Sequence, residues 1–145
     1  MGLFRNLRNG LFPKSHRRRY PIYVDAPPYD ARSGGSRAIN LLASHLTRLG
    51  YEAYVIRRPP DGTPILPGLR FLDSEIRTAH KQDGREPIAV YPEVVVGNPI
   101  GAPFVVRFLL NKPGYFVPDV ELSYGAEDLY VCFDLGYAPA GRPAS

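Results

Sequence analysis

Apolar and polar positions alternate along the chain in a way that predicts strands and helices in turn. Residues 22–24 form a short apolar run between Pro21 and Asp25, which is typical of a buried parallel strand. A loop then leads to a segment in which apolar residues recur at spacings of three and four: Ile39, Leu42, Ala43, Leu46 and Leu49. This stripe predicts an amphipathic helix, with Ser33 or Ser36 as its N-cap.

A second strand is expected directly after this helix. Gly50 stands where a helix commonly ends in a left-handed residue, and residues 51–56 form the next apolar run. The turn Pro59-Pro60-Asp61-Gly62 ends that run. A strand, a helix and a strand joined by short loops require a right-handed crossover and parallel pairing. Residues 20–58 therefore predict the opening of a Rossmann-like α/β domain.

The rest of the chain repeats this pattern less regularly. Residues 73–82 predict a short polar helix, and residues 88–91 predict a third strand. Pro103 suits the first turn of a further helix, whose apolar face would consist of Val105, Val106, Leu109 and Leu110. Residues 129–133 predict a last strand. The expected fold class is α/β, a three-layer Rossmann-like domain with a mainly parallel sheet.

Charge is distributed unevenly over the 145 residues, whose formal net charge is +4. Six cations and no acidic residue precede Asp25: Arg5, Arg8, Lys14, Arg17, Arg18 and Arg19. Subtracting these six charges from +4 leaves −2 for the remainder, so a nucleic-acid partner is not expected. We expect a basic arm over residues 1–19, the α/β domain over residues 20–137, and a tail or truncated linker over residues 138–145.

The arm and the single cysteine bear on where the protein works. In the arm, five apolar side chains oppose the arginines: Leu3, Phe4, Leu7, Leu11 and Phe12. This pattern is typical of short helices that bind membrane surfaces, and a solvated arm is the alternative. Cys132 has no cysteine to pair with, which favours a reducing, cytoplasmic setting. No apolar run is long enough to span a bilayer, so we expect a soluble cytoplasmic protein, with peripheral contact at the inner membrane face as an option.

Two loops follow predicted strands and should share the edge at which open α/β sheets bind ligands. In the first loop, Gly34 and Gly35 present N–H groups at the start of a helix, where the helix dipole favours an anion. A tight turn that lets the helix approach the strand is the alternative reading of these glycines. The second loop carries Glu93 and Asn98. The candidate residues are Tyr29, Asp30, Ser33, Gly34, Gly35, Arg37, Glu93 and Asn98.

The sequence lacks the motifs of several other kinds of functional site. The sequence contains no G-x-G-x-x-G and no Walker A motif, which argues against a dinucleotide or P-loop site. His16, His45 and His80 lie far apart without ligand spacing, so we expect no metal and no cofactor. The surroundings of Ser36 resemble a hydrolase nucleophile elbow, but about ten loop residues separate it from the preceding strand. A helix cap is therefore the favoured role of Ser36, and a small hydrolase is the alternative.

Two groups of residues resemble glycosyltransferases of the GT-B fold. The first is Ser33-Gly34-Gly35 together with Leu42, Ala43, Leu46, Gly50, Glu52 and Val55, which resembles the N-terminal signature of glycosyltransferase family 4. The second is Tyr91-Pro92-Glu93 with the sequence GNPIGA at residues 97–102 and Val105-Val106-Arg107, which resembles a subset of those enzymes. The two groups together extend over residues 22–114.

This resemblance implies half of a GT-B fold: the N-terminal, acceptor-side domain of an enzyme that moves a sugar from a nucleotide-sugar donor to a glycan or other acceptor. By resemblance, Gly34 and Gly35 would lie near the donor phosphates, and Glu93 and Asn98 would lie at the acceptor rim. Ser33 and Arg37 are further candidates for the donor side, and Tyr29 and Asp30 are further candidates for the rim. The nucleotide-sugar is then a substrate, not a cofactor.

The sequence departs from this family in one respect. It lacks the C-terminal half and the paired glutamates of that half, because no glutamate is followed eight positions later by another. We therefore expect a domain that is inactive alone and meets donor and acceptor through a missing or separate C-terminal domain. The alternatives are a non-catalytic saccharide- or nucleotide-binding module, or a truncated relic.

Overall fold

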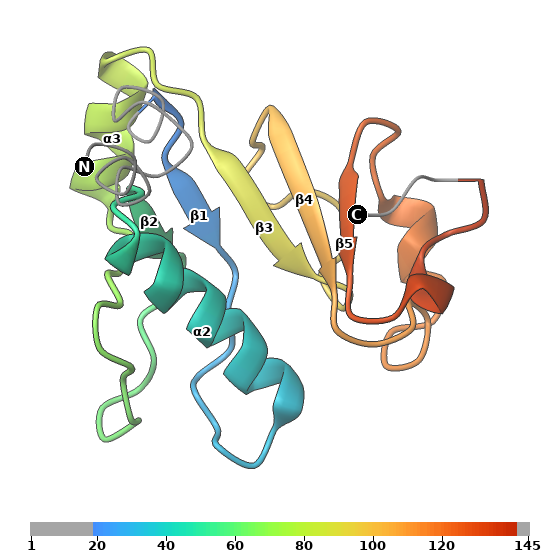
Figure 1. Ribbon diagram of the computed structural model, residues 1–145. Coiled ribbons are helices and arrows are strands. Elements are labelled where there is room, and N and C mark those ends of the chain that lie inside the picture. Colours follow the sequence, from blue (N-terminus) through green and yellow to red (C-terminus); the bar gives the residue numbers. More distant parts are fainter. Residues whose placement is uncertain (1–18, 142–145) are drawn as a thin grey trace, which may run out of the picture.

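Five strands form one sheet in the order β2-β1-β3-β4-β5 (Figure 1). The computed structural model describes residues 19–141. The strands are β1 (Ile22–Val24), β2 (Ala53–Val55), β3 (Ile88–Pro92), β4 (Phe104–Leu109) and β5 (Leu129–Cys132). Every neighbouring pair is parallel. The predicted α/β class with a mainly parallel sheet is confirmed, and this sheet is parallel throughout.

Helix α2 (Gly34–Arg48) begins and ends where its sequence indicates. The Ser33 side chain accepts the N–H of Ser36, so Ser33 is the N-cap. Gly50 follows the last turn with a φ of 86°, a left-handed conformation that favours glycine. Ile39 and Ala43 on the apolar stripe are buried in the core formed with β1, β2 and β3. Local sequence alone is sufficient to define this helix.

Helix α3 (Ser74–Gln82) lies on the opposite face of the sheet, which gives three layers (Figure 1). Asp73 caps it by accepting the N–H of Ile76. Successive strand residues point to opposite faces, so Ile22 and Val24 join the core under α2, whereas Tyr23 contacts His80 of α3. The polar helix predicted at residues 73–82 is thus confirmed. Two short 3-10 helices follow β4 and β5: η1 (Val120–Ser123) and η2 (Leu135–Tyr137).

The helix predicted to start at Pro103 is wrong, because residues 104–109 form strand β4. Phe104 pairs with Ile88 of β3, and Val106 pairs with Leu129 of β5. β-Branched and aromatic residues dominate this segment and suit a strand that has neighbours on both sides. The alternation was hidden because Arg107, at an inward position, is buried as completely as an apolar residue would be.

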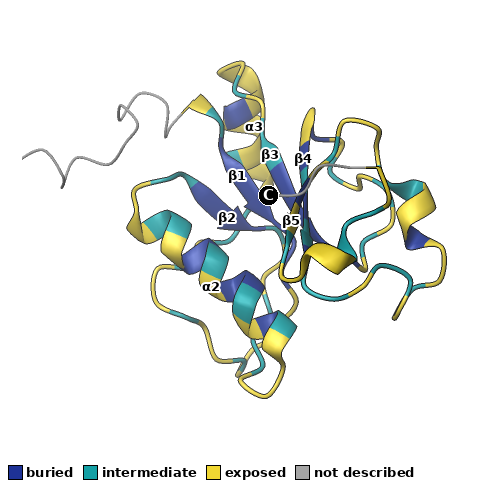
Figure 2. Cartoon of the chain, turned by 45° about the vertical axis from the view of Figure 1, so that its right-hand side comes forward, coloured by how far each residue is buried: buried dark blue, intermediate teal, exposed yellow. Residues whose placement is uncertain are grey.

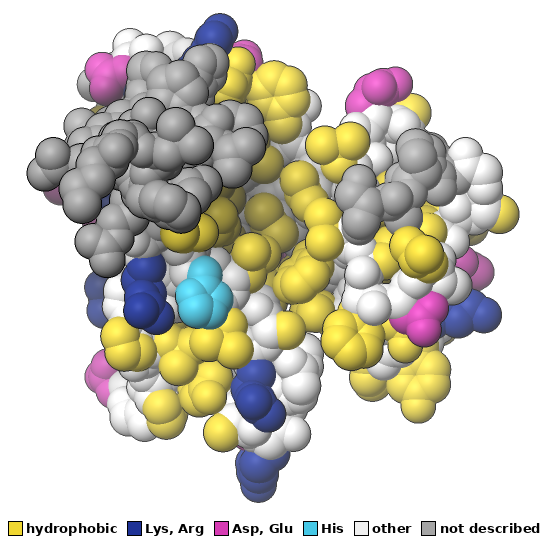
Figure 3. Space-filling view, viewed as in Figure 1, with side chains coloured by type: hydrophobic (Ala, Val, Ile, Leu, Met, Phe, Trp, Pro, Cys, Tyr) yellow, Lys and Arg dark blue, Asp and Glu magenta, His cyan; other side chains and the backbone are white. Residues whose placement is uncertain are grey.

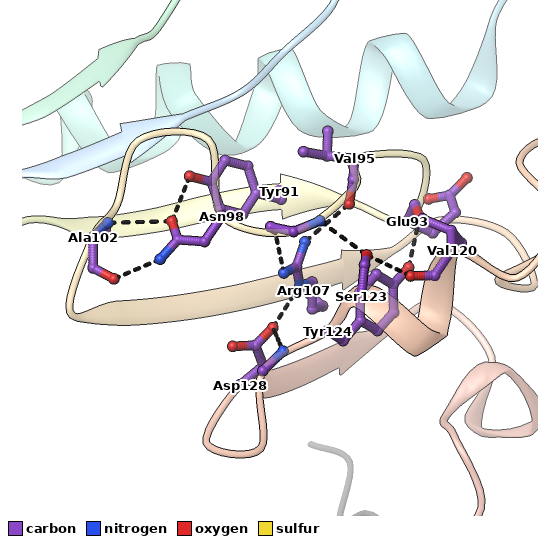
Figure 4. A network of polar contacts seen from close by, with 12 residues as sticks. Tyr91, Glu93, Val95, Asn98, Ala102, Arg107, Val120, Ser123, Tyr124 and Asp128 are labelled. Carbon is purple, nitrogen blue, oxygen red and sulfur yellow. Dashed lines mark hydrogen bonds and ion pairs between the residues drawn. The ribbon is translucent and has the colours of Figure 1, made fainter.

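Arg107 organises the half of the sheet over which the described residues place no α-helix (Figure 4). Its Nε donates to the carboxylate of Asp128 at 2.7 Å. Its two terminal nitrogens donate to the carbonyl oxygens of Val95, at 3.1 Å, and Gly97, at 2.6 Å. The guanidinium carbon lies 4.3 Å from the ring centroid of Tyr124. One side chain therefore ties the β3–β4 connection to β4 and to the turn before β5.

Burial differs between the two halves of the sheet (Figure 2). All three residues of β1 and of β2 are buried, whereas β4 and β5 alternate between buried and more exposed positions. No helix in the described part of the chain is long and apolar enough to cross a membrane. The amphipathic pattern predicted for the arm lies in residues 1–18, outside the described residues.

We expect Arg107→Ala to lower the free energy of unfolding by about 3–5 kcal/mol, because it leaves the carboxylate of Asp128 buried without its cation. Urea unfolding followed by circular dichroism measures this loss. The double variant Arg107→Met/Asp128→Leu should recover part of it, because no unpaired charge then remains in the core, while the carbonyls of Val95 and Gly97 still lack their donor.

Arg32 provides the matched control, since it is an exposed arginine that pairs with Asp30. Arg32→Ala should leave the urea midpoint nearly unchanged. Equal losses in Arg32→Ala and Arg107→Ala would contradict the role assigned to the Arg107 network.

Candidate functional site

The carboxyl ends of the parallel strands form one edge of the sheet, here called the carboxyl rim. Asp25 follows β1, and its carboxylate accepts a 2.6 Å hydrogen bond from the guanidinium of Arg57, which follows β2. The Asp25 side chain is buried and that of Arg57 is exposed. This ion pair was missed at the sequence level. The sequence did contain a signal for it: an acidic residue follows the first predicted strand and a basic residue follows the second. The carboxyl ends of two parallel strands lie at one edge of the sheet, so these two side chains could have been expected to meet.

The loop from β1 to α2 is held rigidly on the carboxyl rim. The hydroxyl of Ser36 donates to the carbonyl of Pro28 and accepts the N–H of Asp30, both at 2.9 Å. The side-chain amide of Asn40 donates to the carbonyl of Pro27 at 3.0 Å. Ser36 and Asn40 are buried, one helical turn apart on α2. These two polar residues therefore set the path of the loop that precedes the glycines.

Ser36 is not arranged as a nucleophile. Its side chain is buried, and its hydroxyl proton is directed at the carbonyl oxygen of Pro28. A serine nucleophile needs an adjacent base to take that proton. Neither partner of the Ser36 hydroxyl is such a base, so the geometry favours a structural role for Ser36.

Gly34 and Gly35 begin α2 with unused N–H groups. The first helical N–H groups have no partner inside a helix, and within residues 19–141 no acceptor takes those of Gly34 or Gly35. Ser33 caps the N–H of Ser36 instead. Gly34 is exposed and Gly35 is half-buried, so both donors lie at the surface of the carboxyl rim. The arrangement suits an anion with two oxygens.

Neither glycine is required by the fold itself. Neither has a positive φ angle, so the backbone does not demand glycine at these positions. A Cβ atom added at Gly34 would meet nothing within 4 Å, and one at Gly35 would reach the Leu110 side chain at an ordinary 3.8 Å. Close packing of helix on strand, the alternative reading of the doublet, therefore does not account for it. Open space above a donor N–H is what a bound ligand needs.

The carboxylate of Glu93 is connected to this helix start through Leu110. Glu93 is buried directly after β3, and one of its oxygens, Oε2, accepts the backbone N–H of Leu110 at 3.1 Å. The Leu110 side chain lies 3.8 Å from where a Cβ atom of Gly35 would be, so Leu110 links the two candidates from distant parts of the sequence. The Glu93 carbonyl accepts the hydroxyl of Tyr124, and burial raises the pKa of that hydroxyl. The Tyr124 hydroxyl is thereby kept as a donor.

The structure places Asn98 away from this group. Its side-chain oxygen accepts the hydroxyl of Tyr91 at 2.9 Å, and its amide donates to the carbonyl of Ala102 at 2.8 Å (Figure 4). The same oxygen accepts the N–H of Ala102. Asn98 therefore closes the β3–β4 connection over the sheet, with each side-chain group engaged.

The remaining predicted residues lie around the glycines on the surface. The exposed Arg37 is in the first turn of α2, and Tyr29 is half-buried. Asp30 accepts the backbone N–H of Arg32, which lowers the pKa of the Asp30 carboxyl. These side chains lie along the β1–α2 loop and the first turn of α2, and Tyr29 lines a small pocket together with Asn40 and Arg57.

A second polar cluster lies on the α3 face. His80 is buried, with one ring nitrogen 2.6 Å from the Tyr23 hydroxyl and the other 3.0 Å from the Glu52 carboxylate. Burial alone would raise the pKa of Glu52, but hydrogen bonds from Arg85, His80 and Tyr54 outweigh burial and lower it to about 2. Because both ring nitrogens of His80 are engaged, the cluster joins β1, β2 and α3 as a structural element.

The described residues contain no group of three or more His, Cys, Asp or Glu side chains that could hold a metal ion. Comparisons of the chain with protein-family models, with curated proteins and with solved structures gave no match. The function is therefore argued from the geometry of the carboxyl rim.

Gly34→Ala should leave the protein as stable as before or stabilise it by up to about 1 kcal/mol, because alanine suits a helix better than glycine and has open space here. Gly50→Ala is the matched control at the other end of α2, where φ is 86°. That control should destabilise the protein by about 1 kcal/mol or more. A loss in Gly34→Ala as large as in Gly50→Ala, measured by urea unfolding, would show that the fold itself needs Gly34.

Glu52 should contribute stability that depends on pH. Its pKa falls from an ordinary 4.5 to about 2 on folding, so the folded state binds this proton less readily. The contribution is complete above about pH 5 and disappears as the pH falls toward 2. The difference in unfolding free energy between the natural chain and Glu52→Gln should shrink over that window. Glu75→Gln, at an exposed position of α3, should leave the neutral-pH midpoint nearly unchanged.

Proposed function

We propose that this chain is the acceptor-side half of a GT-B glycosyltransferase and that its α2 start binds the diphosphate of a nucleotide-sugar. The observation that carries the proposal is the pair of unused N–H groups at Gly34 and Gly35, at positions where the fold does not require glycine. The parallel sheet supports it, because open α/β sheets bind ligands at the carboxyl ends of their strands. The sequence resemblance to the GT-B N-terminal half supports it independently.

The carboxyl rim supplies binding and electrostatic stabilisation. When a sugar leaves its nucleoside diphosphate, negative charge grows on the phosphate oxygens. Two N–H donors and the positive end of the α2 dipole stabilise that charge without rearranging. Arg37 in the first turn adds a cation beside the same donors. These interactions would therefore stabilise the departing nucleoside diphosphate.

Glu93 serves the acceptor or the sugar. One carboxylate oxygen is held by the N–H of Leu110, and the other has no partner among the described residues. A buried carboxylate oxygen without a donor favours a ligand hydroxyl that can supply one. The sugar and the acceptor both carry hydroxyls, and Leu110 connects Glu93 to the start of α2. Donor and acceptor would therefore meet at this rim.

The chain alone is expected to bind and not to catalyse. Group transfer to an acceptor needs water to be excluded and both substrates to be oriented, and a GT-B enzyme does this between two domains. A second domain facing the rim would close the site. We therefore propose a partner domain, on a separate or longer chain, which grips the nucleotide.

A matched pair of variants at Gly34 tests the N–H cradle. Gly34→Pro removes one donor at the first helical position, where proline is well tolerated, and the extended backbone of Ser33 is compatible with a following proline. Gly34→Ala keeps the donor. Titration with uridine, guanosine and adenosine diphosphates, followed by amide NMR, should shift the Gly34 and Gly35 signals in the natural chain. Gly34→Pro should weaken binding about tenfold and Gly34→Ala much less.

Equal affinities of the two variants would refute the cradle, as would signal changes confined to the α3 face. Saturable binding of free saccharides without any response to nucleoside diphosphates would favour the alternative, a saccharide-binding module.

A further inference from the structure

Residues 19–141 leave one face of the sheet apolar and without a covering element at β4 and β5. α2 packs over β1, β2 and β3, and only the inner side chains of β4 reach that core. Beyond them, Phe104 is 46% exposed, Leu129 is 67% exposed and Val131 is 39% exposed. The register places Leu129 opposite Val106 and Val131 opposite Phe108, so all these side chains point to the α2 side. A parallel sheet is normally covered on both faces.

The exposed face forms a groove near the amino ends of the strands. The groove has a volume of about 660 Å³, and its walls include Tyr20, Ile88, Phe104 and Leu129. Its lining is mainly apolar, with Glu127 as the one charged residue among the described residues that line it. Hydrophobic side chains gather along a hollow on this side of the molecule (Figure 3). The groove therefore suits an apolar segment that also carries positive charge.

The chain enters the fold at the wall of this groove. The Tyr20 ring packs edge-on against Phe104, with 5.5 Å between the ring centroids. Residues 1–18 are thus attached directly at the groove. Fully extended, residues 13–19 reach up to about 23 Å, and a ten-residue helix is about 15 Å long, so residues 3–12 can lie anywhere along β4 and β5.

The composition of this attached segment matches the groove. Its apolar side chains are Leu3, Phe4, Leu7, Leu11 and Phe12, and its cations are Arg5, Arg8, Lys14, Arg17 and Arg18. It has no acidic residue. The groove offers apolar area together with the Glu127 carboxylate. Attachment at Tyr20 also gives the segment a high effective concentration at the groove compared with any separate molecule.

We propose that the apolar side chains of residues 3–12 pack into this groove and supply the missing layer over β4 and β5. The inference does not depend on the proposed glycosyltransferase role, since the groove lies at the opposite ends of the strands from the carboxyl rim. It makes the basic arm part of the domain. Because the docked segment covers Phe104 and Leu129, its apolar side is then not available to a membrane.

An engineered disulfide tests the docking in the full chain. In a Cys132→Ser background, the pair Leu7→Cys and Leu129→Cys should form a disulfide within one chain under mild oxidation. The matched control pairs Leu7→Cys with Leu122→Cys. Leu122 is 82% exposed on η1, whose Ser123 bonds the β3–β4 connection on the Arg107 side of the sheet. That control should bridge at least tenfold less.

Each other result would overturn the proposal. Covalent dimers as the main product would assign the groove to a second copy of the chain. Equal bridging in both pairs, or bridging in neither, would show that the arm does not dock there. If the Leu7–Leu129 disulfide does not form and the chain sediments with phosphatidylglycerol vesicles, the apolar side of residues 3–12 would be assigned to a membrane.

A second measurement avoids cysteine chemistry. Leu7→Asp places a charge on the apolar side of the segment and should prevent its docking. The groove is then exposed, and the rate of amide hydrogen exchange should rise in β5, the edge strand. Asn9→Asp is the matched control, because it adds the same charge away from the apolar stripe. We expect exchange in β5 to rise severalfold for Leu7→Asp and to stay unchanged for Asn9→Asp. Identical exchange in both variants would contradict the docking.

Discussion

The half of the sheet that contains β4 and β5 depends on one buried cation, Arg107. β3 and β4 are parallel, and such strands are usually joined by a helix that packs on the sheet. Here the described chain between them is a loop laid across the sheet, and a loop in that position would bury carbonyl groups without donors. Arg107 donates to the carbonyls of Val95 and Gly97 and neutralises Asp128. The cost of burying its charge is offset by these bonds and by the rings of Tyr91 and Tyr124 on either side.

The same arrangement reaches the carboxyl rim. The β3–β4 connection begins at Glu93, whose carbonyl accepts the hydroxyl of Tyr124, and the ring of Tyr124 lies on Arg107. β4 pairs with β3 up to Pro92 and Phe108. Leu110 follows β4 and Glu93 follows β3, so the Leu110 N–H is close enough to donate to the Glu93 carboxylate. The Leu110 side chain in turn lies 3.8 Å from where a Cβ atom of Gly35 would be. The connection from Glu93 through Leu110 to the start of α2 thus follows from how β4 is anchored.

The faces of the sheet are covered by different elements in its two halves. β1 and β2 are enclosed by α2 and α3, and their polar contacts, such as His80 with Tyr23 and Glu52, are satisfied within the core. β4 and β5 are covered on one face by loops around Arg107 and leave the other face apolar and open. The first half provides a rigid platform for the glycines. The second half provides a surface that an additional segment can complete, and the basic arm is attached at its edge.

Local sequence determined the elements whose pattern is complete within a short window. The apolar stripe and caps of α2, the runs of β1 and β3, and the polar helix α3 follow from periodicity, capping and glycine conformation, and together they imply the α/β class. Strand β4 could be identified only from the tertiary structure. Arg107 occupies an inward position of this strand, and an arginine can be buried there only because Asp128 and two backbone carbonyls accept its hydrogen bonds. The site divides in the same way. The glycines at a helix start were visible in the sequence. The approach of the Leu110 side chain to the Gly35 position and the hydrogen bond from Leu110 to Glu93 depend on strand order, which brings together residues far apart along the chain.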